Sequence, residues 1–193
     1  VRRSLLITVQ LFEMGLPLSL ALNMYDEAGQ KGIMIDVDGL SRTFSLDCIP
    51  TIATQRWNID KLDGSVDKAR VSDFQIRYPE AIEDGIGAIA SRLPGAHISG
   101  RSLAIMLLSG DSTLKKWMSE KITADAAMEI EKIRVDVQAK HSDPIGFLIN
   151  RTRLKYVDGI VEKVVRQEER STGRVSAFIG RYSMHPVWGV PIL

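Results

Sequence analysis

Two short apolar runs separated by one helical repeat most strongly constrain how the first part of this chain folds. The runs cover 18–22 and 48–53, and helical repeats lie before, between and after them. This order predicts two parallel strands with helices around them, whose carboxyl ends meet at one edge of a sheet. Ligands of open α/β sheets bind at that edge. The apolar positions of the three helical repeats are Leu5, Val9 and Phe12; Ile33, Val37, Leu40 and Phe44; and Ile59, Leu62, Val66 and Ala69.

Polar residues follow both runs and predict a purine site at this edge. Asn23 and Asp26 come after the first run, and Ala53 and Thr54 end the second. Guanine presents a ring N–H beside an exocyclic amine, and the carboxylate of Asp26 is suited to accept from both. Each charge-assisted hydrogen bond contributes about 1.5–3 kcal/mol, so the pair favours guanine over adenine by about two to four decades. We expect Asn23 to tie the loop and backbone N–H groups near Ala53 and Thr54 to donate to the guanine O6.

Helical patterns replace the strand pattern from about Ser72 onward. They predict a helical subdomain of four to six helices, so the fold class is α/β and then all-α. We expect Ser102 to cap a helix over 103–108, Asp111 to cap the next turn, and Asp143-Pro144 to open a long last helix. The predicted domains are 1–71, 72–176 and a linker with the start of a transmembrane segment at 177–193.

Charge and ligand spacing exclude several functions. The net charge is +1, and lysine and arginine alternate with glutamate along the helices, so we expect no nucleic-acid partner. Charged positions such as 129–132 and 163–169 are interpreted as solvated faces. Cys48 lies in an apolar run and is expected to be a buried residue. We assign no metal ligand, because Cys48, His97, His141 and His185 lack ligand spacing, and no catalytic residue.

No stretch of the chain matches Gly-x-x-x-x-Gly-Lys-Ser/Thr, the loop that binds nucleotide phosphates. We therefore expect the phosphate-binding half of the site, and the strands that complete the sheet, to lie upstream of Val1. On this interpretation the chain is the C-terminal portion of a P-loop-type GTPase domain followed by a helical bundle. It is expected not to hydrolyse GTP by itself.

Four stretches resemble the bacterial ferrous iron transport protein B (FeoB) family. The segment 22–28 is similar to its guanine-specificity motif, 5–16 to the preceding helix, 151–161 to its helical spacer, and 184–193 to the entry of its first transmembrane segment. The resemblance implies GTP or GDP as ligand, with magnesium in the parent protein. It also implies a place on the cytoplasmic face of the bacterial inner membrane, a role in ferrous iron transport, and a transmembrane domain as partner. The base contacts it implies are Asn23, Met24, Asp26, Ala53 and Thr54.

The sequence departs from this family after the second run, and it leaves other functions open. The family has a glycine-containing turn where this chain has 55–58, and Trp57 there is expected either to shield the base or to pack under the next helix. Asn and Asp are also ordinary turn formers, so a structural helical adaptor without nucleotide is the alternative. An α/β domain for another nucleotide is a third hypothesis. The oligomeric state stays open, a homo-oligomer included.

Overall fold

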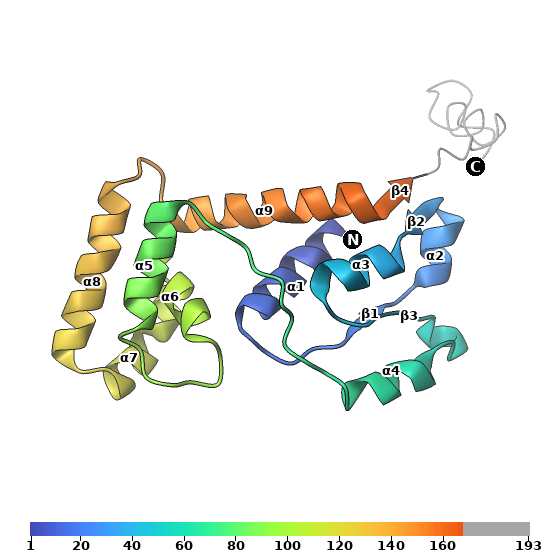
Figure 1. The fold of residues 1–193 in the computed structure, drawn as a ribbon, viewed down its shortest axis with the longest axis horizontal. Coiled ribbons are helices and arrows are strands. Elements are labelled where there is room, and N and C mark those ends of the chain that lie inside the picture. The colour runs from blue at the N-terminus through green and yellow to red at the C-terminus, as the bar shows by residue number, and fades with distance from the viewer. Residues whose placement is uncertain (168–193) are drawn as a thin grey trace, which may run out of the picture.

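A computed structural model of the chain describes residues 1–167 and places an α/β region ahead of a helical one (Figure 1). Helical apolar spacing forms the first helix, where Leu5, Val9 and Phe12 are buried. The elements of the α/β region are α1 (Arg2–Glu13), β1 (Leu20–Leu22), α2 (Tyr25–Gln30), β2 (Ile33–Ile35), α3 (Val37–Phe44), β3 (Cys48–Pro50), the 3-10 turn η1 (Ala53–Gln55) and α4 (Ile59–Val66).

The two apolar runs form neighbouring parallel strands, which confirms the predicted pairing. Leu20 lies opposite Cys48 and Leu22 opposite Pro50. Both strands are shorter than the runs that predicted them, and the second ends at Pro50 because residues 53–55 turn into η1. Cys48 is buried as expected, and this burial raises the pKa of its thiol.

The helix predicted to include Ile33 is wrong at its start. Ile33–Ile35 forms β2, which pairs antiparallel with β4 (Val165–Gln167). The helix α3 begins only at Val37, because the Asp36 side chain accepts a hydrogen bond from the Gly39 N–H at 2.8 Å and caps it. The partner strand comes from the far end of the described chain, so no local pattern predicts this pairing.

The helical region contains five α-helices within residues 80–164, inside the predicted range of four to six. Asp111 caps the turn after the second of them, as expected. The predicted cap Ser102 is wrong: Ser99 caps that helix, its hydroxyl accepting from the Ser102 N–H at 3.0 Å. The elements are α5 (Glu80–Ala90), α6 (Gly100–Leu108), the 3-10 turn η2 (Ser112–Leu114), α7 (Lys115–Lys121), α8 (Ala124–Ala139) and α9 (Ile145–Val164).

Helix α9 joins the two regions. It has 20 residues and is therefore about 30 Å long. It begins beside α5 and α6 and extends over α1 and α3 to β4 (Figure 1). In residues 1–167, no helix has the length and apolar character needed to cross a membrane.

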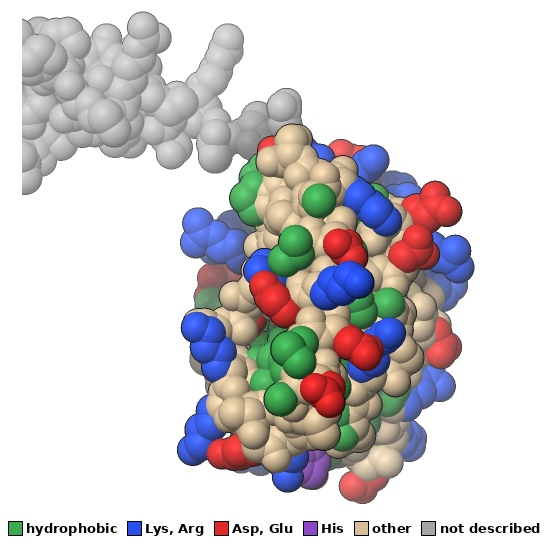
Figure 2. Space-filling view, turned by 90° about the vertical axis from the view of Figure 1, so that its left-hand side faces the viewer, with side chains coloured by type: hydrophobic (Ala, Val, Ile, Leu, Met, Phe, Trp, Pro, Cys, Tyr) green, Lys and Arg blue, Asp and Glu red, His purple; other side chains and the backbone are tan. Residues whose placement is uncertain are grey.

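The far end of the helical region, formed by α8, carries acidic and basic side chains side by side (Figure 2). Glu129 pairs with Arg92 at 2.7 Å, and Glu131 pairs with Arg134 at 2.6 Å. Lys132 between them is exposed. These positions form a solvated face, as the charge pattern predicted.

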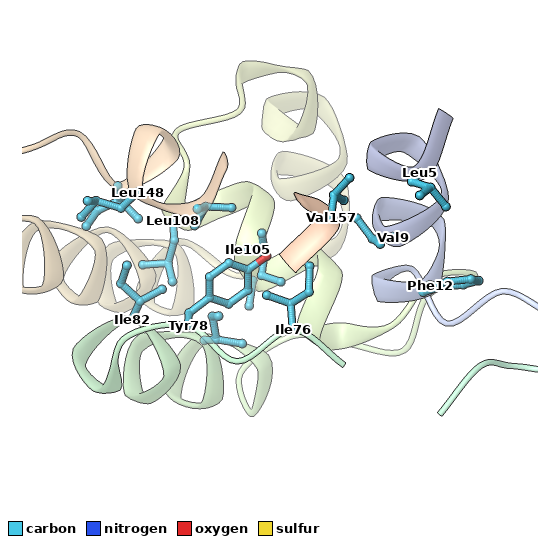
Figure 3. Close-up of a cluster of buried hydrophobic side chains, with 14 of the residues drawn as sticks. Leu5, Val9, Phe12, Ile76, Tyr78, Ile82, Ile105, Leu108, Leu148 and Val157 are labelled. Atoms are coloured by element: carbon cyan, nitrogen blue, oxygen red, sulfur yellow. The ribbon is translucent and has the colours of Figure 1, made fainter. Parts of the chain in front are cut away.

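One hydrophobic core runs through both regions (Figure 3). Ile82 and Leu108 belong to its helical part, and Val157 of α9 extends it to Val9 of α1 (Figure 3). Phe44 of α3 is fully buried and lies with its ring centroid 4.8 Å from that of Phe12. The α/β region is thus packed onto the helical region along α9.

A buried ion network adds a polar connection between the regions. The Glu13 side chain is 4% exposed and accepts two hydrogen bonds from Arg153 of α9, at 2.9 Å from Nε and 2.7 Å from Nη2. The Tyr78 hydroxyl donates to the same carboxylate. Burial, together with the negative charge of Glu13, raises the pKa of Tyr78. One carboxylate at the end of α1 therefore holds both α9 and the 67–79 linker.

Candidate functional site

The loops after β1 and β3 are tied together at the carboxyl edge of the strand pair. The Asn23 side-chain oxygen accepts from the Ala53 N–H at 3.1 Å and from the Thr51 hydroxyl at 3.4 Å. The Tyr25 N–H donates to the Thr51 carbonyl at 3.3 Å. Asn23 thus ties the two loops, as its position after the first run predicted.

Met24 and Asp26 lie on the loop and first turn that follow β1. Met24 has a left-handed backbone (φ 61°), and its side chain is largely in solvent, 54% exposed. Asp26 stands in the first turn of α2, half-buried, and one of its oxygens lies 3.5 Å from Nε2 of Gln55 in η1. A contact of that length is weak. The carboxylate therefore faces the second loop and keeps its acceptor capacity.

The second loop is a tight turn stapled by its own backbone. Ile52 and Trp57 exchange two backbone hydrogen bonds at 3.2 and 3.3 Å, which brings the ends of the turn together. Arg56 and Asn58 adopt left-handed backbone conformations (φ 54° and 58°), where the family pattern has a glycine-containing turn. The Asn58 amide donates to the Pro50 carbonyl at 2.9 Å and fixes the turn to β3.

Ala53 and Thr54 are exposed at the tip of this loop. The Ala53 N–H, predicted as a possible donor to a base, donates instead to Asn23. The Thr54 N–H has no acceptor among residues 1–167. The structure thus brings all five predicted site residues to one edge, with one backbone donor engaged and one available.

Sequence reasoning missed three further contributors to this edge. Thr51 is 1% exposed and forms a buried part of the loop connection. Trp57 is 42% exposed, and its ring stacks on Tyr25 at 6.4 Å between centroids, so it does not simply pack under α4. An aromatic residue inside each motif was the available signal, but only the folded loops place the two rings against each other.

No metal centre accompanies the site in the part of the chain that the structure describes. Residues 1–167 contain no group of three or more His, Cys, Asp or Glu side chains arranged to hold a metal ion. The predictions for His185, for the membrane-entry segment 184–193, and for the ends of the second and third predicted domains lie outside the described residues.

Two protein-family models match the chain, one after the other. The model described as ferrous iron transport protein B matches residues 1–66, and the model described as the FeoB cytosolic helical domain matches residues 78–166. The first contains the β1–β3 edge, and the second contains α5 to α9. Together they account for most of the chain.

Curated relatives match over the whole chain. The chain is 24% identical to an Fe(2+) transport protein A/Fe(2+) transporter FeoB fusion protein of Porphyromonas gingivalis and covers 24% of that protein. It is also 24% identical to the Fe(2+) transporter FeoB of Escherichia coli K12, covering 25% of it. The chain thus spans about a quarter of the length of the curated relatives it matches.

Solved structures share the fold. A crystal structure of a Streptococcus-type "S. thermophilus" NFeoB mutant bound to GDP superposes with a TM-score of 0.73 at 24% identity, covering 86% of this chain and 65% of that one. The agreement extends over both the α/β and the helical regions described above. With two models of one family matching in tandem, the chain belongs to the FeoB family and carries part of its G domain followed by its cytosolic helical domain.

Proposed function

We propose that the β1–β3 edge recognises the guanine base of GTP or GDP. The observation that carries this proposal is the hydrogen bond from the Ala53 N–H to Asn23, which holds the two loops together around Asp26. An NFeoB structure with GDP bound is among the proteins that share the fold, which supports a nucleotide as the ligand.

Each proposed contact follows from the atoms that remain available. Asp26 accepts from the ring N–H and the exocyclic amine of guanine, displacing its weak contact with Gln55. The Thr54 N–H is the donor to O6, since that of Ala53 is engaged by Asn23. The exposed Met24 side chain lies against the base and supplies packing in place of the lysine that many GTPases carry there.

We propose that the whole protein is a ferrous iron transporter of the bacterial inner membrane. Residues 1–71 then belong to its G domain, 72–176 form a helical spacer that stabilises the GDP-bound state, and 177–193 lead into the first transmembrane segment. Both relatives named above are described as Fe(2+) transporters, which supports this role. The nucleotide domain acts at the cytoplasmic face, and its partner is the protein's own transmembrane domain.

A base-swap experiment tests the nucleotide proposal. Fluorescent GDP, ADP and xanthosine diphosphate are titrated into the longest protein that the coding region encodes, and into its Asp26→Asn variant. Xanthine has a carbonyl where guanine has the exocyclic amine, so the new amide donates to it. We expect the variant to lose GDP affinity by about ten- to a hundredfold and to gain affinity for the xanthine nucleotide.

Asp38→Asn is the matched control, because Asp38 is an exposed aspartate in the first turn of α3. It is expected to leave all three affinities unchanged. An unchanged base preference in Asp26→Asn contradicts the proposal and favours the alternative, a structural helical adaptor. Preferential binding of ADP by the unsubstituted protein favours an α/β domain for another nucleotide.

A further inference from the structure

A second cleft lies away from the β1–β3 edge, between the linker and α9. Its volume is about 680 Å³, within the usual range of small-molecule sites. Phe74 and Arg77 of the linker form one wall, and Tyr156 and Ile160 of α9 form the other. The linker is the segment that runs from α4 up to α5 in Figure 1. The α9 residues lie three or four positions apart and so present one face of the helix to the cleft.

The charged side chains that line the cleft are all basic. They are Arg77 on the linker and Lys155 and Lys163 on α9, the two lysines about 12 Å apart along the helix. No carboxylate lines the cleft, and within residues 1–167 none of the three cations forms a salt bridge. Arg77 does act on Glu83 at longer range, but that carboxylate is paired with Arg101. Three positive charges thus face one space in a chain whose net charge is only +1.

The polar groups between these cations also favour an acceptor-rich ligand. The hydroxyls of Thr43 and Thr152 already donate to backbone carbonyls of their own helices. The Tyr156 hydroxyl accepts from the Arg77 N–H at 3.4 Å, which leaves its proton available to a ligand. Arg77, the two lysines and Tyr156 are therefore the donors that face the cleft.

The rest of the lining is apolar. Phe74 and Tyr156 meet edge to face, 6.3 Å between centroids, and Ile160 lies on the next turn of α9. A small inorganic anion contacts the cations but leaves this surface uncovered. A ligand with an apolar body beside its anionic group uses both parts of the lining.

We propose that the cleft binds an organic phosphate, a phosphomonoester attached to an aromatic or alkyl body. The dianionic phosphate matches the three cations better than a carboxylate does, and the body packs on Phe74, Tyr156 and Ile160. The same chemistry occurs in soluble phosphomonoesters and in the headgroup of phosphatidic acid. This site is separate from the proposed nucleotide site, which lies on other loops.

Titration of the full chain with phenyl phosphate tests the proposal. Binding is followed by calorimetry and by NMR shifts of the Arg77, Tyr78 and Tyr156 amides. Phenyl phosphate is expected to bind about tenfold more tightly than inorganic phosphate, because its ring covers apolar lining. Arg77→Gln and Lys163→Gln are each expected to weaken phenyl phosphate binding about tenfold.

Lys132→Gln is the matched control, since it removes one exposed positive charge on α8. It is expected to leave binding unchanged, and thermal unfolding checks that every variant is folded. A parallel arm measures sedimentation with phosphatidylcholine vesicles that contain phosphatidic acid. Binding of such vesicles alone, lost in Arg77→Gln and Lys163→Gln, supports the lipid source; binding of phenyl phosphate supports the soluble source. Failure of both ligands to bind, or equal weakening by Lys132→Gln, overturns the proposal.

Discussion

In the helical region, apolar side chains at helical spacing pack into a core that includes Ile82, Ile86 and Ile105, each 2% exposed or less. At the β1–β3 edge, strands of only three residues are held by loop hydrogen bonds from Asn23 and Asn58. Burial stabilises the first region in many small contributions, whereas a few polar contacts shape the second. The difference teaches that the candidate nucleotide site is more easily altered than the scaffold on which it lies. The ion network around Glu13 connects the two regions, and breaking it tests their mutual dependence most severely.

The largest expected effect is that of Glu13→Ala. Removing this carboxylate leaves the Arg153 guanidinium, 14% exposed, without its anion and the Tyr78 hydroxyl without its acceptor. An unpaired buried charge costs about 3–5 kcal/mol, and we expect the free energy of unfolding to fall by that amount. Urea denaturation measures it. Glu131→Ala, which breaks an exposed pair, is the control with an expected loss below about 0.5 kcal/mol. If both variants lose equally little, the network does not couple the regions.

A pair of glycine substitutions sharpens the comparison from the helical side. A Cβ added at Gly85 lies 2.7 Å from a methyl carbon of Val137 on α8, so Gly85→Ala forces α5 and α8 apart. We expect a loss of about 1–3 kcal/mol in the free energy of unfolding. Gly87 has no atom within 4 Å of the same position, so Gly87→Ala is expected to gain up to about 1 kcal/mol through helix propensity. Thermal or urea unfolding reads both, and effects of the same sign contradict a tightly packed α5–α8 contact.

On the loop side, Asn23→Ala removes the connection between the two loops. The lost hydrogen bonds to Ala53 and Thr51 are worth about 1 kcal/mol, so the Ala53 amide is expected to exchange with solvent about fivefold faster. Hydrogen-exchange NMR measures this, and amides of α5 and α6 are expected to keep their rates. Asn150→Ala, at an exposed position of α9, is the control. Uniform acceleration across the molecule is the result that does not fit, because it means that the edge and the core unfold together.

The smallest expected effect is a pH dependence carried by Glu83. Partial burial favours the neutral carboxyl, but hydrogen bonds donated by Arg101 and by the Tyr78 N–H outweigh it and hold the pKa of Glu83 below its ordinary 4.5. The ionised carboxylate therefore stabilises the fold above the unfolded pKa, and that stability is lost as pH falls through the folded pKa. We expect Glu83→Gln to flatten the fall in stability between about pH 5 and pH 3 by up to about 1 kcal/mol.

Urea denaturation at a series of pH values measures that slope. Asp84→Asn, next to Glu83 on α5 and exposed, is the matched control and is expected to keep the original profile. Identical slopes in the two variants show that the Arg101 pair does not contribute to acid sensitivity.

Local patterns predicted most of the fold because they report which face of each element is buried. The spacing of Leu5, Val9 and Phe12 predicted α1, and the two apolar runs predicted β1 and β3 as parallel neighbours. The prediction was wrong at Ile33, where a strand forms because β4 supplies its partner. It was also wrong at Ser102, because a serine three residues earlier satisfies the helix start.

The candidate site was predictable in membership and not in geometry. The five predicted residues do lie at one edge, but that the Ala53 N–H is engaged and the Thr54 N–H is free depends on how the loop turns. The Tyr25–Trp57 stack likewise joins two motifs about thirty residues apart in the chain. The basic cleft has no sequence motif at all, because Arg77 and Lys163 meet only when α9 folds back over the linker.

By itself, the sequence determined where helices and strands form, which faces they bury, and which polar residues follow the strands, since hydrophobic periodicity and turn chemistry act over a few neighbouring residues. The tertiary structure alone decided the β2–β4 pairing, the Glu13 network and the cleft, since these join residues that are far apart along the chain. Such contacts are selected by the packing of the whole molecule, where the long helix α9 brings both regions together.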